Sequence, residues 1–454
     1  EMYARAADLY MRGGAEQFSQ IDIRFHETES VPEGEALGAL SGAEFLYWCI
    51  RHSLSDVLVP ILKRELERDL RRDAEALALS IIKRNLRSQL MVKPLTDQRV
   101  LGISPGYRTG CKLAALDQNG AVLESVVVYP HTPLNEKEQA TAKILELIQT
   151  HGLTLAAIGD GTACQETEAL LSEIIEAQCP EFRYAVLREA PAEVYAESSL
   201  GKKELGGLDD GVRTAVSLGR QMLDPLQELV KISLRDLCSA RYVQEVDGSA
   251  LEEAMRRVAE ECVANVGPRI NTAPRTMLKY VPGMDGRTAL EIVRWREEKG
   301  PLANRAQLRQ VPKIDEVCWQ RASGFLRVEE SDNPLDRTRI HPKDYPAAQR
   351  MLEQMGFSLD DICDEARRQE IKAKGGEVKF AELEKEFDVH YLCLKDILDE
   401  LSNPWPDPRE AEEGPILRKP DTLARVLFGA TDSEAIGKAL REAGGSSDIR
   451  PVFL

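Results

Sequence analysis

The sequence predicts a multidomain protein in which one α/β domain lies between helical regions. The first observation is a meander of apolar runs at residues 100–103, 112–116 and 121–129, the last two joined by Asp-Gln-Asn-Gly. An Asn-Gly turn between β-rich runs is typical of a hairpin. The second observation is the alternation of strands and helices that follows, which indicates a mixed sheet covered by helices. The third is a pair of similar helix-turn-helix units between residues 277 and 328.

Four regions follow from this pattern. Residues 1–98 are predicted to be helical, 99–235 to form the α/β domain, 236–330 to hold the paired units, and 331–454 to be helical and acidic. Inside the α/β domain, hydrophobic periodicity predicts helices at 136–149, 166–177 and 214–223 and strands at 155–158 and 184–187.

Composition narrows the class of protein. Apolar residues make up 43% of the 454 residues and charged residues 30%, as in globular proteins that bury a core. No apolar run approaches the roughly 20 residues that cross a bilayer, and no signal peptide is apparent. The nine cysteines form no Cys-x-x-Cys pair, so we expect free thiols, no zinc site and a cytoplasmic location.

The net charge of −17 argues against a general binder of polyanions. Charge is nevertheless uneven along the chain. Residues 269–330 carry twelve Lys and Arg against eight Asp and Glu, and the acidic excess gathers around 360–413. A basic patch on an acidic protein is therefore compatible with this sequence.

Two stretches resemble a known family. The stretch LGISPGYRTGCKLAALD, followed by YPH, resembles the YqgF-like domain of the bacterial Tex proteins, which is related to RNase H and RuvC. The stretch NTAPRTMLKYVPGMDGRTALEIVRWREEKGPL resembles their tandem helix-hairpin-helix. The resemblance covers roughly residues 40–410 and implies an RNase H-like mixed sheet. After residue 413 we expect no S1 domain, and we expect a short helix and loop at 431–454.

The resemblance also implies where a nuclease of this fold would hold its metals. Enzymes of this type place carboxylates at the end of the first strand, after the fourth strand, and at the start of the last helix, to bind two divalent ions. The corresponding residues here are Ser104, Glu189 and a position near Val212. Further carboxylates close to these positions are Asp160, Asp209 and Asp210.

Ser104 is the departure from the family pattern, because the family usually has Asp in this turn. A serine hydroxyl is no anionic ligand for Mg²⁺. We therefore expect no catalytic residue, no metal and no cofactor, with Ser104, Glu189 and Asp160 as remnants of the site. The alternative for the carboxylates is an ordinary role in turns and helix caps.

The first hairpin of the paired units is the predicted nucleic-acid contact. Gly283 and Gly286 permit a tight turn that presents backbone N–H groups at the start of the next helix, where the helix dipole favours a phosphate. Such contacts hold the backbone without reading bases. The second hairpin, at 311–315, either adds Lys313 or is a packing turn. The predicted contact residues are Gly283, Met284, Gly286, Arg287, Thr288, Lys313 and Arg321.

Two other features have a functional and a structural interpretation. Basic side chains between residues 63 and 87 form either a nucleic-acid surface or a solvated helix face balanced by acids. Cys111 beside Lys112 is either a thiol of low pKa or a buried strand residue.

From these observations we expect a non-enzymatic, largely sequence-independent nucleic-acid-binding transcription accessory factor. Its expected partners are RNA, DNA or both, with components of the transcription or translation machinery, and the chain is expected to be a monomer without a membrane partner. Two alternatives remain: a metal-dependent nuclease of the RNase H or RuvC type, and a degenerate paralogue that acts as a protein-binding scaffold.

Overall fold

The computed structural model describes residue 50 and residues 53–237, 246–404, 407–411, 414–415 and 417–418. These residues divide between two compact units, one within residues 1–85 and 238–255 and the other within residues 86–237 and 256–454. The expected helix and loop at 431–454 lie outside the described residues, as does most of the stretch after residue 413.

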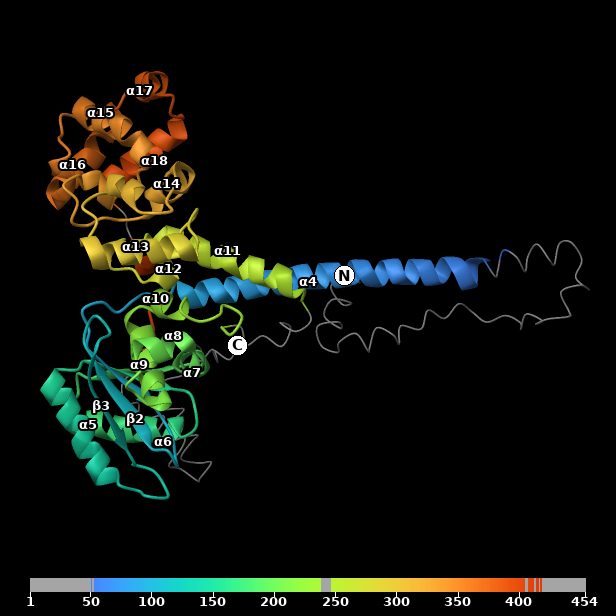
Figure 1. Cartoon of the computed structure of the whole chain (residues 1–454), viewed down its shortest axis with the longest axis vertical. Helices are drawn as coiled ribbons and strands as arrows, with labels where there is room; N and C mark the ends of the chain where they lie inside the picture. The colour runs from blue at the N-terminus through green and yellow to red at the C-terminus, as the bar shows by residue number, and fades with distance from the viewer. Residues whose placement is uncertain are drawn as a thin grey trace, which may run out of the picture. The chain divides into compact units, whose positions relative to one another are not determined.

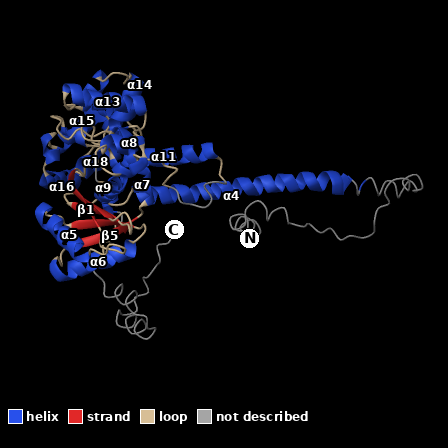
Figure 2. Cartoon of the chain, turned by 60° about the horizontal axis from the view of Figure 1, so that its bottom comes forward, coloured by secondary structure: helices blue, strands red, loops and turns tan. Residues whose placement is uncertain are grey.

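A five-stranded mixed sheet forms the α/β domain (Figures 1 and 2). Its order is β3-β2-β1-β4-β5, with β1, β2 and β3 antiparallel and with β4 and β5 parallel to β1. The predicted meander and the mixed sheet are therefore confirmed. The strands are β1 (Val100–Ser104), β2 (Cys111–Leu116), β3 (Val122–Val128), β4 (Leu155–Gly159) and β5 (Arg183–Leu187).

Helices cover both faces of the sheet. Leu101 and Ile103 of β1 lie in one core with α5 (Lys137–His151) and α6 (Cys164–Gln178), whereas Val100 lies in a second core with α9 (Asp210–Leu223). This alternation follows from the two-residue period of a strand. Gly102 permits the close approach of α9, because a Cβ there would lie 1.9 Å from the carbonyl oxygen of Ala215.

Shorter and longer helices complete the first half of the chain. A π-helical turn, η2 (Ser53–Leu58), leads into the long helix α4 (Val59–Leu90). After the sheet come α7 (Ala190–Glu197), α8 (Ser199–Glu204), α10 (Pro225–Leu229) and α11 (Gly248–Val266). Among the described residues, no helix is both long enough and apolar enough to span a membrane.

The paired helix-hairpin-helix is present, as predicted. The first unit consists of α12 (Arg275–Leu278) and α13 (Gly286–Lys299), and the second of η4 (Arg305–Gln310) and α14 (Glu316–Ala322). Both units use the same turn: Met284 N–H donates to the Val281 carbonyl at 2.9 Å, and Ile314 N–H donates to the Val311 carbonyl at 3.3 Å. The repeat of sequence is therefore a repeat of backbone structure.

A further helical domain follows the paired units. Its four α-helices close around a core of their own that includes Met351, Leu383 and Leu394. Sequence analysis predicts only an acidic helical region here, so this packed domain is a feature that it missed. The helices are α15 (Tyr345–Met355), α16 (Glu365–Lys374), α17 (Phe380–Phe387) and α18 (Tyr391–Ser402), with 3₁₀ turns η5 (Ser323–Phe325), η6 (Pro334–Arg337), η7 (Pro342–Asp344), η8 (Asp360–Cys363), η9 (Gly375–Glu377) and η10 (Pro408–Ala411).

Arg305 links the second hairpin unit to this domain. Its side chain is only 1% exposed, and its guanidinium donates to the carbonyl oxygens of Leu326 at 2.7 Å and Ile340 at 2.8 Å. It also donates to the Tyr345 hydroxyl at 2.8 Å and to the Thr338 carbonyl. A buried guanidinium that satisfies so many backbone acceptors fixes the chain between residues 326 and 345.

The end of the described chain returns to the α/β domain. Arg409, which is buried, pairs with Asp407 and reaches Asp224 at 2.8 Å. Arg418 pairs through its backbone with Tyr184 of β5 in an antiparallel bridge and through its side chain with Glu168 at 2.6 Å. The edge strand β5 is thus partly covered by the chain itself.

Candidate functional sites

The first candidate site lies where β1 ends. The Ser104 hydroxyl donates to Oε1 of Glu189 at 2.6 Å, and the two side chains are 8% and 6% exposed. Sequence analysis predicts that these residues share a site, and the structure brings them into direct contact. The position that holds a carboxylate in nucleases of this fold therefore holds a hydrogen-bond donor to the neighbouring carboxylate.

The turn after β4 packs against the same Glu189 side chain. The Glu189 N–H donates to Asp160 at 2.8 Å, so the third predicted remnant is also in this cluster. A Cβ on Gly161 would lie 1.9 Å from Oε2 of Glu189. Burial raises the pKa of the Glu189 carboxyl, and Glu193 and Asp160 raise it further, while hydrogen bonds from Ser104 and from the Gly161 backbone lower it. Both carboxylate oxygens therefore face protein groups.

The start of α9 is the third position of the predicted site. Asp209 caps this helix by accepting from the Gly211 N–H at 3.3 Å, and Asp210 pairs with Arg213. Val212 is buried in the helix. A Cβ on Gly211 would lie 2.8 Å from Cε of Lys112, the residue paired with Ser104 across β1 and β2. The first turn of α9 thus lies beside the end of β1. Its two carboxylates cap the helix and form an ion pair within it.

A buried polar network that the sequence did not single out lies on the same end of β2. The His131 Nε2 and the Thr167 hydroxyl are 2.9 Å apart, and the Cys111 sulfur lies 3.6 Å from that hydroxyl. Burial raises the pKa of the Cys111 thiol and lowers the pKa of His131. Of the two interpretations of Cys111, the structure therefore supports the buried strand residue and not the thiol of low pKa. No group of three or more potential metal ligands occurs in the part of the chain that the structure describes.

The second candidate site is the first hairpin. Gly283 has a φ of 84°, the left-handed conformation that glycine tolerates. A Cβ there would lie 2.5 Å from the Cβ of Arg321 in α14. The turn and Arg321, which sequence analysis places in the same site, are therefore in contact. Met284 and Thr288 of the predicted set are buried.

Asp285 occupies donors that a phosphate would need. It is the N-cap of α13, and its Oδ1 accepts from the N–H groups of Arg287 at 2.9 Å and Thr288 at 2.8 Å. These bonds lower the pKa of Asp285, the one from Thr288 most. Asp285 thus stabilises the turn through bonds from its side chain to the backbone. The expectation that α13 presents its first N–H groups freely is wrong for Arg287 and Thr288, because their own cap binds them.

The cations around this hairpin fall into three groups. Arg287 and Arg321 are exposed, and neither pairs with a carboxylate among the residues that the structure describes. Lys313 instead pairs with Glu291 at 2.8 Å, and Arg294 with the same carboxylate at 3.2 Å. The side chain of Arg296 donates to backbone carbonyls and is a structural residue. The open part of the site thus comprises the Gly283 turn, Arg287 and Arg321.

The second hairpin repeats the geometry without glycine. Lys313 adopts a φ of 65° at the position that corresponds to Gly283, and Asp315 caps α14 by accepting from the Cys318 N–H at 2.7 Å. A lysine in the left-handed conformation costs backbone energy, which its ion pair with Glu291 offsets in part. This hairpin matches the predicted packing turn better than a second phosphate contact.

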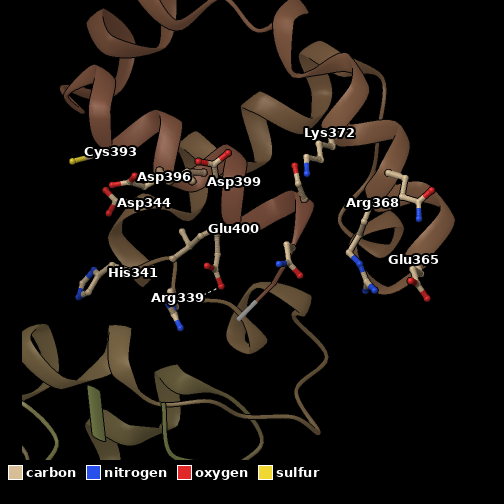
Figure 3. A pocket seen from close by; sticks show the side chains of 15 residues that line it. Arg339, His341, Asp344, Glu365, Arg368, Lys372, Cys393, Asp396, Asp399 and Glu400 are labelled. Atoms are coloured by element: carbon tan, nitrogen blue, oxygen red, sulfur yellow. Dashed lines mark hydrogen bonds between the residues drawn. The ribbon is translucent and has the colours of Figure 1, made fainter. Parts of the chain in front are cut away.

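An open groove of about 870 Å³ lies in the last helical domain (Figure 3). Arg368 and Lys372 line it from α16, and Asp396 and Asp399 line it from α18, so opposite charges face one another across it. The Arg339 N–H donates to Glu400 at 2.9 Å within this lining. No sequence motif points to a site here.

Known protein families match the α/β domain, the paired hairpin units and the last helical domain. Residues 98–223 match the Tex protein YqgF-like domain, residues 263–327 a helix-hairpin-helix motif, and residues 333–409 an HHH domain. The fold and the hairpins therefore define a protein that joins a YqgF-like domain to helix-hairpin-helix domains. The helical domain of α15 to α18, which the sequence analysis missed, is the second of these helix-hairpin-helix domains. The chain thus carries a YqgF-like domain of the Tex type together with helix-hairpin-helix domains, and it is similar to Tex proteins over most of its length.

Individual relatives agree with this assignment. Protein tex of Bordetella pertussis is 35% identical over 376 residues, which cover 82% of this chain and 46% of the relative. Transcriptional accessory protein Tex of Neisseria gonorrhoeae is 35% identical over 344 residues, 75% of this chain and 44% of the relative. YdcI of Bacillus subtilis is 36% identical over 375 residues, which cover 83% of this chain and 52% of the relative. The chain spans about half the length of these relatives.

Proposed function

We propose that this chain binds nucleic acid through phosphate contacts at the first hairpin and acts as an accessory factor in transcription. The observation that carries the proposal is the Gly283 turn, which has a left-handed φ, packs against Arg321 and lies beside the exposed Arg287. A turn of this kind, with two exposed guanidinium groups that pair with no carboxylate among the described residues, suits a phosphate. The similarity to Protein tex of Bordetella pertussis and to the transcriptional accessory protein Tex of Neisseria gonorrhoeae supports the role in transcription.

The proposed binding is independent of base sequence. Contacts of this kind go to the phosphate backbone, which is the same at every position. We propose RNA, DNA or both as ligands, together with components of the transcription or translation machinery, for a monomer in the cytoplasm. The overall charge of −17 opposes tight binding, so we expect dissociation constants at or above about micromolar at physiological salt.

We propose further that the YqgF-like domain is not a nuclease. The carboxylate of Glu189 already accepts from Ser104 and from the Gly161 backbone, and Asp209 and Asp210 serve α9. These residues lack the set of free carboxylates that would clamp two metal ions across a phosphate. Cleavage of single- or double-stranded RNA or DNA in Mg²⁺ or Mn²⁺, if the parent shows it and Glu189→Gln abolishes it, would overturn this part.

The binding proposal is tested by fluorescence anisotropy. Labelled single- and double-stranded RNA and DNA of equal length are titrated with the full chain at several salt concentrations. We expect affinity to fall linearly on a log–log plot against salt, and Arg287→Ala to reduce the slope by about one unit. A salt-independent affinity, or no binding even at low salt, would favour the protein-binding scaffold instead.

A further inference from the structure

An apolar ridge runs from Ile50 through η2 and along helix α4, and it is covered along only part of its length. Every fourth residue from position 50 to position 90 is apolar, a spacing that brings neighbours into contact and turns the ridge by about 40° around the helix at each step. Eleven residues form the ridge: Ile50, Leu54, Leu58, Leu62, Leu66, Leu70, Ala74, Ala78, Ile82, Leu86 and Leu90.

Exposure divides this ridge into two parts. The six residues from Leu70 to Leu90 are each 9% exposed or less, as core residues are. The five residues from Ile50 to Leu66 are each between 45% and 55% exposed. Residue type does not explain this difference, because the exposed part consists of large Leu and Ile side chains. Contiguous exposed apolar surface of this kind marks an interaction surface.

The exposed part is too broad for a single helical partner. Val57 and Ile61 are also 52% and 50% exposed, and they widen the ridge on one side. Within α4, the apolar face from Ile61 to Leu66 spans about 140° at 100° per residue. A two-stranded coiled coil buries a narrow seam, whereas a face wider than about 100° is typical of a helix that packs against several elements. A second copy of this chain in a simple helix pair would leave much of the face uncovered.

We propose that residues 1–49 of this chain cover the exposed ridge between Ile50 and Leu66. The ridge at 50–66 is about 25 Å long at 1.5 Å per residue, so two helices laid along it need about 34 residues and a turn. The 49 preceding residues are sufficient. Their sequence also has suitable faces: Met2, Ala6, Leu9 and Tyr10 recur at helical spacing, and Phe45, Leu46 and Trp48 gather near the junction.

The test is hydrogen exchange of the full chain, read by mass spectrometry. We compare the parent with the double variant Leu58→Gln, Leu62→Gln, which makes the ridge polar. The matched control is Glu67→Gln, because Glu67 is exposed and lies nine residues after Leu58, about 180° around the helix. We expect amides in residues 1–49 and in the first turns of α4 to exchange at least about tenfold faster in the double variant and unchanged in the control.

Two further readouts make each outcome decisive. Peptides from residues 98–223 report whether the rest of the chain stays folded, and Leu62→Ala provides a milder change if the double variant unfolds. Residues 1–49 of the parent exchanging as fast as in urea, or exchanging equally in parent and ridge variants, would overturn the proposal. Protection that rises with protein concentration, together with a dimer in sedimentation velocity, would assign the ridge to a second copy.

Discussion

At the end of β1, a hydroxyl donor faces a buried carboxylate. Ser104 stabilises the charged form of Glu189 through a 2.6 Å hydrogen bond, while burial favours the neutral form. The net pKa of Glu189 lies above its ordinary value. Because folding raises this pKa, the free energy of unfolding is highest below the unfolded-state pKa of Glu189. It falls as pH rises through the folded-state pKa.

Ser104→Ala should make this loss larger. Without the hydroxyl, ionised Glu189 is a buried charge with one fewer donor, so the variant should be less stable than the parent by about 1–3 kcal/mol at pH 7. The difference should shrink at about pH 4, where the carboxyl is protonated. Urea unfolding at both pH values measures this, with the exposed Ser80→Ala as control. An equal loss at both pH values would contradict this electrostatic account.

Arg305 provides a second prediction at the scale of a single residue. Replacing it by Met would leave the carbonyls of Leu326, Ile340 and Thr338 without their donor, and each unsatisfied buried acceptor costs about 1–3 kcal/mol. We expect Arg305→Met to destabilise the chain by at least about 3 kcal/mol. Arg305→Lys should fail to rescue it, because an ammonium group lacks the planar fork.

The exposed Arg309, which pairs with Glu316, is the matched control for Arg305. Arg309→Met should change stability by less than about 1 kcal/mol, as is usual for surface ion pairs. The comparison is made by urea unfolding followed by circular dichroism at a helical wavelength. Equal effects of the two substitutions would show that the buried network around Arg305 contributes little.

At the scale of the element, the first hairpin contains an opposing feature. Asp285 caps α13 and uses the N–H groups of Arg287 and Thr288, and its negative charge repels a phosphate. Asp285→Asn should keep the cap, since Asn is also a good N-cap residue, and remove the charge. We expect tighter nucleic-acid binding by about two- to fivefold, corresponding to the 0.3–1 kcal/mol typical of a charge at a helix end.

Anisotropy titration at low salt measures this effect, and Asp315→Asn in the second hairpin is the control. Asp315 caps α14 in the same way, but it belongs to a hairpin whose Lys313 is paired with Glu291. We expect little change there. Weaker binding by Asp285→Asn would mean that the carboxylate organises the contact and does not oppose it.

Elements with strong local patterns could be predicted from the sequence. The meander, the alternation of strands and helices and both hairpins follow from turn residues and apolar spacing, which act over a few positions. The domain at 333–409 was missed as a helix-hairpin-helix domain, because its turns lack the Val-Pro signature of the first two units. The local sequence did not reveal that the Asp285 cap uses the N–H groups predicted to meet a phosphate.

Features that depend on distant parts of the chain could not be predicted. Sequence analysis places Ser104, Glu189 and Asp160 in one site through family resemblance, but the direct bond between Ser104 and Glu189 joins residues 85 positions apart. Arg305 has no local signal, because its partners lie 21 to 40 residues later. The half-exposed ridge of α4 has the same apolar spacing throughout, so only the structure distinguishes its two parts.

At the scale of the whole molecule, charge has to be considered by region. A net charge of −17 opposes nucleic acid, whereas residues 269–330 carry an excess of four positive charges, twelve Lys and Arg against eight Asp and Glu. Ion pairs with Glu291 remove Lys313 and Arg294 from that excess, so the binding surface reduces to a small patch at the first hairpin. The proposed function therefore depends on the geometry of that hairpin more than on total charge.

The most direct test of this claim compares two glycines of the same module by anisotropy titration. Gly283 and Gly300 have φ angles of 84° and 87°, so Ala strains the backbone at both. A Cβ meets Arg321 at 2.5 Å only at position 283, since nothing lies within 4 Å of a Cβ at position 300. We predict that Gly283→Ala weakens nucleic-acid binding by roughly tenfold, as expected for a lost hydrogen bond to a charged group, and that Gly300→Ala binds like the parent. Equal binding by both folded variants would contradict the account.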